Sequence, residues 1–219
     1  MSRRAAQLLV IAKAPVPGRV KTRLSPPCTP EQAAALAAAA LADTLDVVRA
    51  TAVARRVVAF DGDPALADLS GLEVIAQRGD GLGQRLANAF AQAMSGPDGD
   101  RPTLLVGMDT PQLDVPLVTA ALAALAQAPA VLGLATDGGW WALGLHDPAH
   151  AALLAGVPMS RADTGVRTGA ALTAEGIRWA ALPELSDVDT FDDARRVAAA
   201  APDTRFAREL AALTGVPVA

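Results

Sequence analysis

Four cationic side chains fall within an eleven-residue segment near the start of the chain and are suited to binding a phosphate group. They follow directly after the apolar run of residues 8–12. Pro15 and Pro17 restrict the backbone between them, while Gly18 permits a close backbone approach. Cations and backbone amides that converge in this way favour an anionic ligand, and a solvated basic loop is the alternative. The four cations are Lys13, Arg19, Lys21 and Arg23.

Two acidic motifs are suited to binding a divalent cation. Asp109 follows the apolar run of residues 104–107, and Asp187 and Asp189 precede an expected helix. Proteins commonly hold Mg²⁺ through a few carboxylates together with water and substrate phosphates, and oxygen ligands suit Mn²⁺ as well. We therefore predict Mg²⁺ or Mn²⁺ at Asp109 with Asp187, Asp189 or both. Helix capping by Asp109 and Asp189 is the alternative.

A third motif, Asp137-Gly138-Gly139-Trp140, follows the apolar run of residues 131–135. Paired glycines allow the backbone to come close to a substrate, and Trp140 or the adjacent Trp141 could form a wall beside it. We predict that these four residues line the side of the site that binds the acceptor. A tight turn beside core tryptophans is the alternative.

Residues 77–85 form a glycine-rich turn that opens an expected helix. Its backbone amides and the Arg85 guanidinium could contact a nucleotide or an acceptor, and we assign Gly81, Gly83 and Arg85 to the donor side. The spacing of these glycines differs from that of a dinucleotide fingerprint, and the cationic segment likewise lacks the spacing of a Walker loop. A glycine-rich turn without a ligand is the alternative.

Residues 160–167 combine hydroxyl, acidic and basic side chains. Ser160 and Thr164 lie near Arg161, Asp163 and Arg167 in this segment. The pattern is typical of a helix start, and a lid on the acceptor side is the alternative.

Short apolar runs that alternate with helical segments must position these residues. The chain of 219 residues, 52% of them hydrophobic, is expected to form one domain over residues 1–219. The alternation predicts a three-layer, doubly wound α/β fold with a mostly parallel sheet, whose ligands bind at the carboxyl ends of the strands. Thr29, Pro30 and Gln32 predict a capped start for the first helix. The expected strands are 8–12, 57–60, 72–76, 104–107, 131–135 and 179–182, and the expected helices include 29–50, 82–94 and 115–127.

Composition argues against several functional classes. The formal net charge of -4 provides no broad positive field, so we expect no nucleic-acid partner. Cys28 is the single cysteine, which suits a reducing cytoplasm and excludes a cysteine-based zinc cluster. The apolar stretch of residues 5–12 is too short to span a bilayer, so we expect a cytoplasmic protein without a membrane partner. The two histidines lie near Pro148 and give little support to histidine catalysis.

Four segments, taken together and in order, resemble the DUF2064 proteins, also called radical-SAM/selenodomain-associated transferase 1. Members are commonly labelled glycosyltransferases, and the first segment also resembles the phospholactate guanylyltransferases. The resemblance implies a nucleotide-diphospho-sugar transferase fold of the glycosyltransferase-A (GT-A) type. It also implies that Asp109 binds the metal, that the four cations contact the donor, and that Asp187 and Asp189 lie on the other side of the metal. The segments are residues 12–24, 107–113, 137–145 and 187–194.

The leading functional hypothesis is nucleotidylyl transfer. An oxyanionic small-molecule acceptor would attack the α-phosphate of a nucleoside triphosphate, with Lys21 and Arg23 stabilising the pyrophosphate that leaves. Glycosyl transfer from a nucleotide sugar is the alternative, with Asp137 or another carboxylate as the base. A noncatalytic nucleotide-binding module is a third hypothesis. The base, the acceptor and the oligomeric state do not follow from the sequence.

Overall fold

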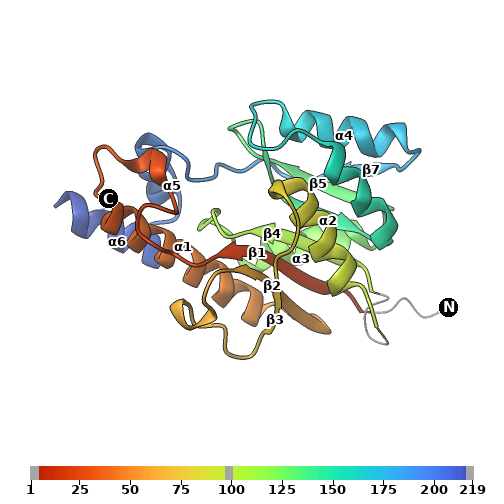
Figure 1. Ribbon diagram of the computed structural model, residues 1–219, viewed down its shortest axis with the longest axis horizontal. Helices are drawn as coiled ribbons and strands as arrows, with labels where there is room; N and C mark the ends of the chain where they lie inside the picture. The colour runs from red at the N-terminus through yellow and green to blue at the C-terminus, as the bar shows by residue number, and fades with distance from the viewer. Residues whose placement is uncertain (1–4, 97–100, 216–219) are drawn as a thin grey trace.

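The computed structural model describes residues 5–96 and 101–215, which form an α/β fold around one seven-stranded sheet (Figure 1). The strand order is β3-β2-β1-β4-β6-β5-β7. β6 runs antiparallel to both of its neighbours, and every other pairing is parallel. The strands are β1 (Gln7–Lys13), β2 (Arg55–Asp61), β3 (Glu73–Ala76), β4 (Thr103–Gly107), β5 (Ala130–Leu134), β6 (Trp140–Leu145) and β7 (Trp179–Ala181).

Both faces of the sheet are buried, which explains why its central strands are almost continuously apolar. Alternate residues of β1 point to opposite faces: Leu8 and Val10 belong to one core cluster and Leu9 to the other. The first cluster lies under α1 (Pro30–Ala50) and α3 (Val115–Leu125). The second lies under α2 (Gly81–Ala93), the 3-10 helix η3 (Pro148–Gly156) and α4 (Thr164–Ala174). This arrangement confirms the predicted three-layer, mostly parallel fold.

The start of α1 confirms the predicted cap. The Thr29 side chain accepts a hydrogen bond from the Gln32 amide, and the Gln32 side chain accepts one from the Thr29 amide. Pro30 occupies the first helical position, where its missing amide hydrogen costs nothing. The capping box therefore fixes where the cationic loop ends and the first helix begins.

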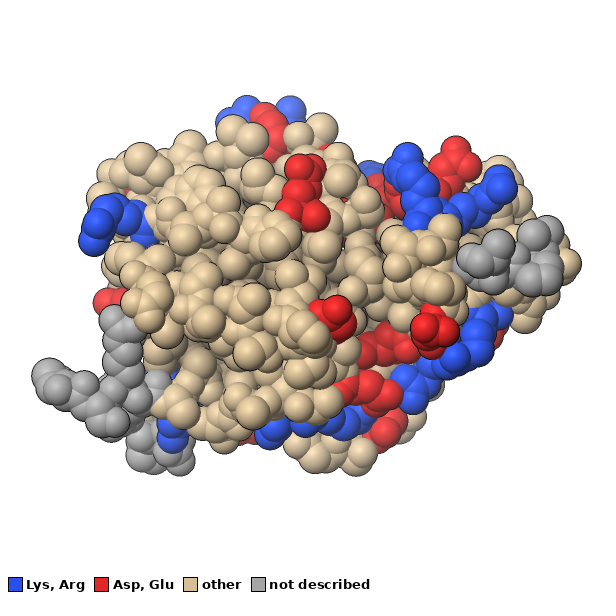
Figure 2. All heavy atoms as spheres, turned by 180° about the vertical axis from the view of Figure 1, so that it is seen from behind, with Lys and Arg blue, Asp and Glu red and all other residues tan. Residues whose placement is uncertain are grey.

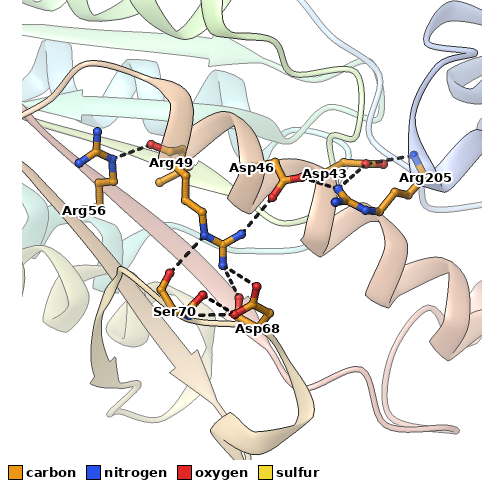
Figure 3. Close-up of polar contacts among 8 residues, drawn as sticks. Asp43, Asp46, Arg49, Arg56, Asp68, Ser70 and Arg205 are labelled. Carbon is orange, nitrogen blue, oxygen red and sulfur yellow. Dashed lines mark hydrogen bonds and ion pairs between the residues drawn. The ribbon is translucent and has the colours of Figure 1, made fainter.

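A third apolar cluster lies beyond the sheet, where α5 (Phe191–Ala200) and α6 (Arg205–Thr214) pack against α1. Figure 3 shows the polar side of this contact. Asp43 of α1 accepts hydrogen bonds from the first two amides of α6, those of Arg205 and Phe206, at 3.0 and 2.9 Å. The Arg205 guanidinium also pairs with Asp46 at 2.5 Å. These contacts hold α6 against α1.

Two elements differ from the sequence prediction. The run that follows Trp140 forms the central antiparallel strand β6, which reaches its position through a tight turn with no intervening helix. The α6 helix was also not predicted, although Thr204 caps it by accepting a hydrogen bond from the Ala207 amide.

The surface of the molecule shows mixed charge. On the face seen from behind in Figure 2, uncharged residues cover most of the surface, a few acidic side chains lie near its middle, and acidic and basic side chains lie together toward the margins. Within the part of the chain that the structure describes, no helix is long and apolar enough to cross a membrane.

Candidate functional site

A cleft of about 830 Å³ lies at the carboxyl ends of the parallel strands. The strands β2 and β4 flank β1 on opposite sides, so the chain changes direction there and leaves a crevice, as expected for an α/β sheet. The half of the sheet that contains β1 to β3 contributes one wall, lined by Lys13, Lys21, Arg23, Asp61, Gln77 and Arg85. The half that contains β5 to β7 contributes the other, lined by Asp137, Gly139, Trp140, Met159, Arg161 and Asp187.

The Lys21 ammonium lies at the centre of the cleft and joins its two walls. Its Nζ is 3.0 Å from Oδ2 of Asp109, which follows β4, and it also donates to the carbonyl oxygen of Val188. The Lys21 side chain is 10% exposed, against 43% for Asp109, so the pair lies at the floor with its carboxylate facing the opening. Arg23 forms an ion pair with Asp189 nearer to solvent. The structure therefore brings together the cationic loop and both predicted acidic motifs.

A shared apolar cluster explains why these segments, far apart in sequence, meet. Leu24 and Val188 are both fully buried, in the cluster that also contains Phe206 of α6. Leu24 follows Arg23, and Val188 lies between Asp187 and Asp189, so each buried side chain fixes the charged residues beside it. The Val188 amide further donates to the Asp109 carbonyl oxygen at 3.1 Å.

Asp187 is the most perturbed acid of the cleft. Its Oδ1 is buried and lacks a hydrogen-bond partner. Burial, followed by the negative charges of Asp137 and Asp109, raises the pKa of Asp187 to about 6, although the Lys21 charge opposes the shift. Around Asp187, three carboxylates thus interact with the single ammonium of Lys21.

This charge excess fits a divalent cation with an incomplete protein ligand set. Within residues 5–96 and 101–215, no group of three or more His, Cys, Asp or Glu side chains lies in metal-binding geometry. Mg²⁺ usually takes one or two carboxylates and completes its shell with water and substrate phosphates. Asp109 and Asp187, the second with a free buried oxygen, suit that arrangement.

Replacing Asp187 with asparagine is expected to stabilise the metal-free protein at pH 8. Because the folded-state pKa exceeds the ordinary value of 3.8, the stability gained from protonation is complete below about pH 3.8 and is lost as pH rises through about 6. Allowing for partial exposure of the side chain, we expect a gain of about 1 to 2 kcal/mol at pH 8. Thermal unfolding in the presence of a chelator at pH 8, 6 and 4.5 measures it. A variant that is equally or less stable at pH 8 would contradict this account of Asp187.

The predicted acceptor wall is a turn that packs tightly on a neighbouring loop. Asp137 accepts a hydrogen bond from the Gly139 amide at 2.7 Å, and Gly138 adopts φ +90°. A Cβ at Gly138 would lie 1.9 Å from the Ala162 carbonyl oxygen, so this position requires glycine. Gly138 itself is not among the residues that line the cleft, because it faces Ala162.

The two adjacent tryptophans lie in different surroundings. Trp140 is half-buried, lines the cleft and packs against the core under α2 and η3. Trp141 is 2% exposed, packs on the opposite face of the sheet and donates its indole N–H to the Pro183 carbonyl oxygen at 2.9 Å. Both tryptophans line the cleft, but Trp140 is the more exposed of the two and is therefore better placed to contact a ligand.

On the donor side, the predicted glycines do not line the cleft. Gly18 adopts φ +73° in the cationic loop with open space around it, and Gly81 starts α2 with φ +79°. Gly83 is required by packing, because a Cβ there would lie 2.3 Å from the Leu154 carbonyl oxygen. Arg85 of the same helix does line the cleft and pairs with Asp61 at 2.9 Å.

The predicted cations divide between the main cleft and its margin. Lys13 lines the cleft, and its Nζ donates to the Arg19 carbonyl oxygen at 2.6 Å, which closes the loop. The Arg19 side chain lies instead at an adjoining cavity of about 140 Å³, which Lys13 and Asp61 also line.

Two polar lining residues of the donor wall, Asp61 and Gln77, were not among the predicted site residues, although Gln77 begins the predicted glycine-rich turn. Asp61 ends β2 and Gln77 follows β3, so searching after every expected strand would have found both. The Gln77 amide donates to the carbonyl oxygens of Ala12 and Ala59 at 2.7 and 3.0 Å, and so holds together the ends of β1 and β2.

Solved structures share this fold. A protein from Desulfovibrio desulfuricans G20, described as a putative nucleotide-diphospho-sugar transferase, matches with a TM-score of 0.83 and 28% identity, over 96% of this chain and 94% of that one. Rv0371c of Mycobacterium tuberculosis H37Rv, in complex with manganese, matches with a TM-score of 0.54 and 22% identity over 88% and 98%. CMP:2-keto-3-deoxy-manno-octonic acid synthetase, complexed with CTP, matches with a TM-score of 0.55 and 14% identity over 88% and 96%. A search of curated proteins finds no match.

The match to a protein family confirms the resemblance that the sequence motifs indicate. A model of the family described as "Uncharacterized protein conserved in bacteria (DUF2064)" matches residues 44–161, which is more than half of the chain. The matched segment includes the metal-binding candidate Asp109 and the turn from Asp137 to Trp140. The chain therefore belongs to the DUF2064 family.

Proposed function

We propose that this protein is a metal-dependent transferase with a nucleotide-activated donor, and that it transfers a nucleotidyl group from a nucleoside triphosphate to a small oxyanionic acceptor with release of pyrophosphate. The observation that supports this most is the position of Lys21, a nearly buried cation between Asp109 and the Val188 carbonyl oxygen. A cation held in place before the substrate binds costs little reorganisation when charge develops on a leaving group.

In this proposal the β1 side of the cleft binds the donor. Lys13, Lys21 and Arg23 provide positive charge along one wall for the β- and γ-phosphates, and Asp109 and Asp187 would hold a divalent cation. That cation would neutralise phosphate charge and polarise the donor. Because an oxyanionic acceptor is itself a nucleophile, no protein base is needed, and the residues act by positioning and electrostatics.

The comparisons support the class of donor. The D. desulfuricans protein is described as a putative nucleotide-diphospho-sugar transferase, and the structure of the CMP:2-keto-3-deoxy-manno-octonic acid synthetase was solved with CTP. The D. desulfuricans protein, whose sequence is 28% identical to this chain, favours glycosyl transfer as the second candidate function. In that reaction the same cations would face the diphosphate of a nucleotide sugar, and no pyrophosphate would leave.

Thermal unfolding with a panel of ligands separates the two candidates. We expect one nucleoside triphosphate to stabilise the protein in a Mg²⁺- or Mn²⁺-dependent manner, by roughly 2.7 kcal/mol at a hundred times its dissociation constant. The panel contains each triphosphate and several nucleotide sugars, with and without metal. Stabilisation by a nucleotide sugar alone would favour glycosyl transfer, and no stabilisation by any ligand would contradict the donor site.

A further inference from the structure

We propose that Arg161 binds an anionic group of the acceptor, a phosphate or carboxylate that does not itself react, at the wall opposite the cationic loop. The inference rests on the proposed function, because it treats this wall as the acceptor side. Arg161 follows η3 and lines the same cleft as Lys21 and Asp109, but from the other half of the sheet. The acceptor would then be an oxyanion, and Arg161 would be the residue that recognises it.

Charge pairing distinguishes Arg161 from three of the other cations of the cleft, while the fourth, Lys13, lies on the opposite wall and donates to the Arg19 carbonyl oxygen. Lys21, Arg23 and Arg85 pair with Asp109, Asp189 and Asp61 respectively. The carboxylate nearest to Arg161 in this network is Asp163, at 3.7 Å, and Asp163 already pairs with Arg167 at 2.6 Å. The Arg167 hydrogen bond also lowers the pKa of Asp163. Two guanidinium groups therefore share one carboxylate, which leaves a net positive charge at the rim.

The backbone that carries Arg161 is fixed, while its side chain remains accessible. The Thr164 hydroxyl accepts from the Arg161 amide at 3.1 Å and donates to the Pro158 carbonyl oxygen at 2.9 Å. Thr164 is 4% exposed, whereas the Arg161 side chain is 64% exposed. The next residue, Gly165, donates its amide to the Gly138 carbonyl oxygen at 2.8 Å. The loop and the turn at Gly138 thus form one unit that presents a solvated guanidinium to the cleft.

The surroundings explain why an acceptor would need this cation. Asp137 and Asp187 give the same wall negative charge, which would repel an anionic molecule that approaches Asp109. Trp140 and Met159 add apolar surface to the same wall. An acceptor that contacts this apolar surface and reacts near Asp109 would gain from placing its second anionic group at Arg161, where charge-assisted hydrogen bonds are strong.

Phosphate titrations followed by amide and indole NMR signals test the proposal. Inorganic phosphate is the first probe and acetate the second, each added to the metal-free protein. We expect the signals of residues 159–164 and the Trp140 indole to shift in one saturable process, separate from shifts in the cationic loop. Binding of phosphate alone would assign a phosphate to the acceptor, and binding of acetate as well would admit a carboxylate. If neither probe shifts these signals, the proposal is wrong.

Two variants should weaken phosphate binding at this wall, and a third should strengthen it. Arg161→Gln is expected to weaken phosphate binding at this wall about tenfold, because it removes a charged hydrogen-bond donor. Asp163→Asn should strengthen phosphate binding by about threefold, because it removes the carboxylate that competes for the Arg161 guanidinium. Arg167→Gln should weaken phosphate binding by about threefold, because Asp163 is then free to pair with Arg161. Arg178→Gln removes an exposed arginine beyond α4 and serves as the control. Equal effects of Arg161→Gln and Arg178→Gln would overturn the proposal.

A variant of the cationic loop separates this inference from the proposed function. In Lys21→Met, the proposed function predicts weaker triphosphate binding, whereas the signals of residues 159–164 should still respond to phosphate in an Arg161-dependent manner. Unchanged triphosphate binding with intact phosphate binding would overturn the proposed function alone. Triphosphate binding that depends on Lys21, with no effect of Arg161 on phosphate, would overturn this inference alone.

Discussion

Replacing Asp109 with asparagine is expected to lower metal-dependent pyrophosphate release by about a thousandfold, the largest effect of any single substitution in the cleft. Asp109 is the acid that faces the opening and lies 3.0 Å from the Lys21 ammonium. Asparagine keeps the size of the side chain but removes the charge that would hold the cation. It also leaves Lys21 without its neutralising partner, so the charge balance of the donor wall changes as well. Initial rates over a series of Mg²⁺ and Mn²⁺ concentrations measure the effect.

The control for this substitution is Asp192→Asn, which removes one exposed acid from the first turn of α5. It changes the net charge equally and is expected to leave the rate within about twofold, since Asp192 does not line the cleft and solvent and salt screen an exposed charge. A rate for Asp109→Asn close to that of Asp192→Asn would show that Asp109 plays no part in the reaction.

Replacing Gly138 with alanine is expected to destabilise the protein by about 3 to 4 kcal/mol, because backbone strain and a steric clash add together. The φ angle of +90° is unfavourable for alanine, and the new Cβ would lie 1.9 Å from the Ala162 carbonyl oxygen. That oxygen belongs to the backbone of the loop that presents Arg161, so relief of the clash must move the acceptor wall. Chemical denaturation measures the loss of stability.

Gly176→Ala isolates the contribution of the backbone angle in this experiment. Gly176 adopts φ +72° but has no atom within 4 Å of the position of a Cβ, so only strain should appear there, at about 1 to 2 kcal/mol. Equal losses for the two variants would mean that the turn at Gly138 does not pack on the loop as described.

The sequence predicts the strands of the central sheet well because burial on both faces makes them continuously apolar. It also predicts that Lys13 and Asp109, which each follow an expected strand, belong to one site, because ligands bind at the carboxyl ends of the strands, and both residues line the cleft. The antiparallel strand β6 was not predicted, although it is as continuously apolar as the other buried strands. Its apolar run follows a glycine turn, and the pattern does not reveal the direction in which a buried strand runs.

Contacts between distant segments were not predictable from local patterns. Lys21 donates to the Val188 carbonyl oxygen, 167 positions away, because Leu24, Val188 and Phe206 share one core cluster. Such a cluster depends on how α5 and α6 return to α1, which no periodicity in the sequence specifies. Gly83 shows the converse error, because a glycine required by the packing of α2 on η3 resembles one required by a ligand.

Pyrophosphate release from a nucleoside triphosphate would show directly whether this protein catalyses nucleotidylyl transfer. The stabilising triphosphate is incubated with Mg²⁺ or Mn²⁺ and a panel of phosphorylated and carboxylated acceptors, with wild type and Lys21→Met compared at each. We predict pyrophosphate release that requires metal and one acceptor, and that falls by about a hundredfold in Lys21→Met. Turnover of a nucleotide sugar without pyrophosphate, or pyrophosphate release unaffected by Lys21→Met, would contradict it.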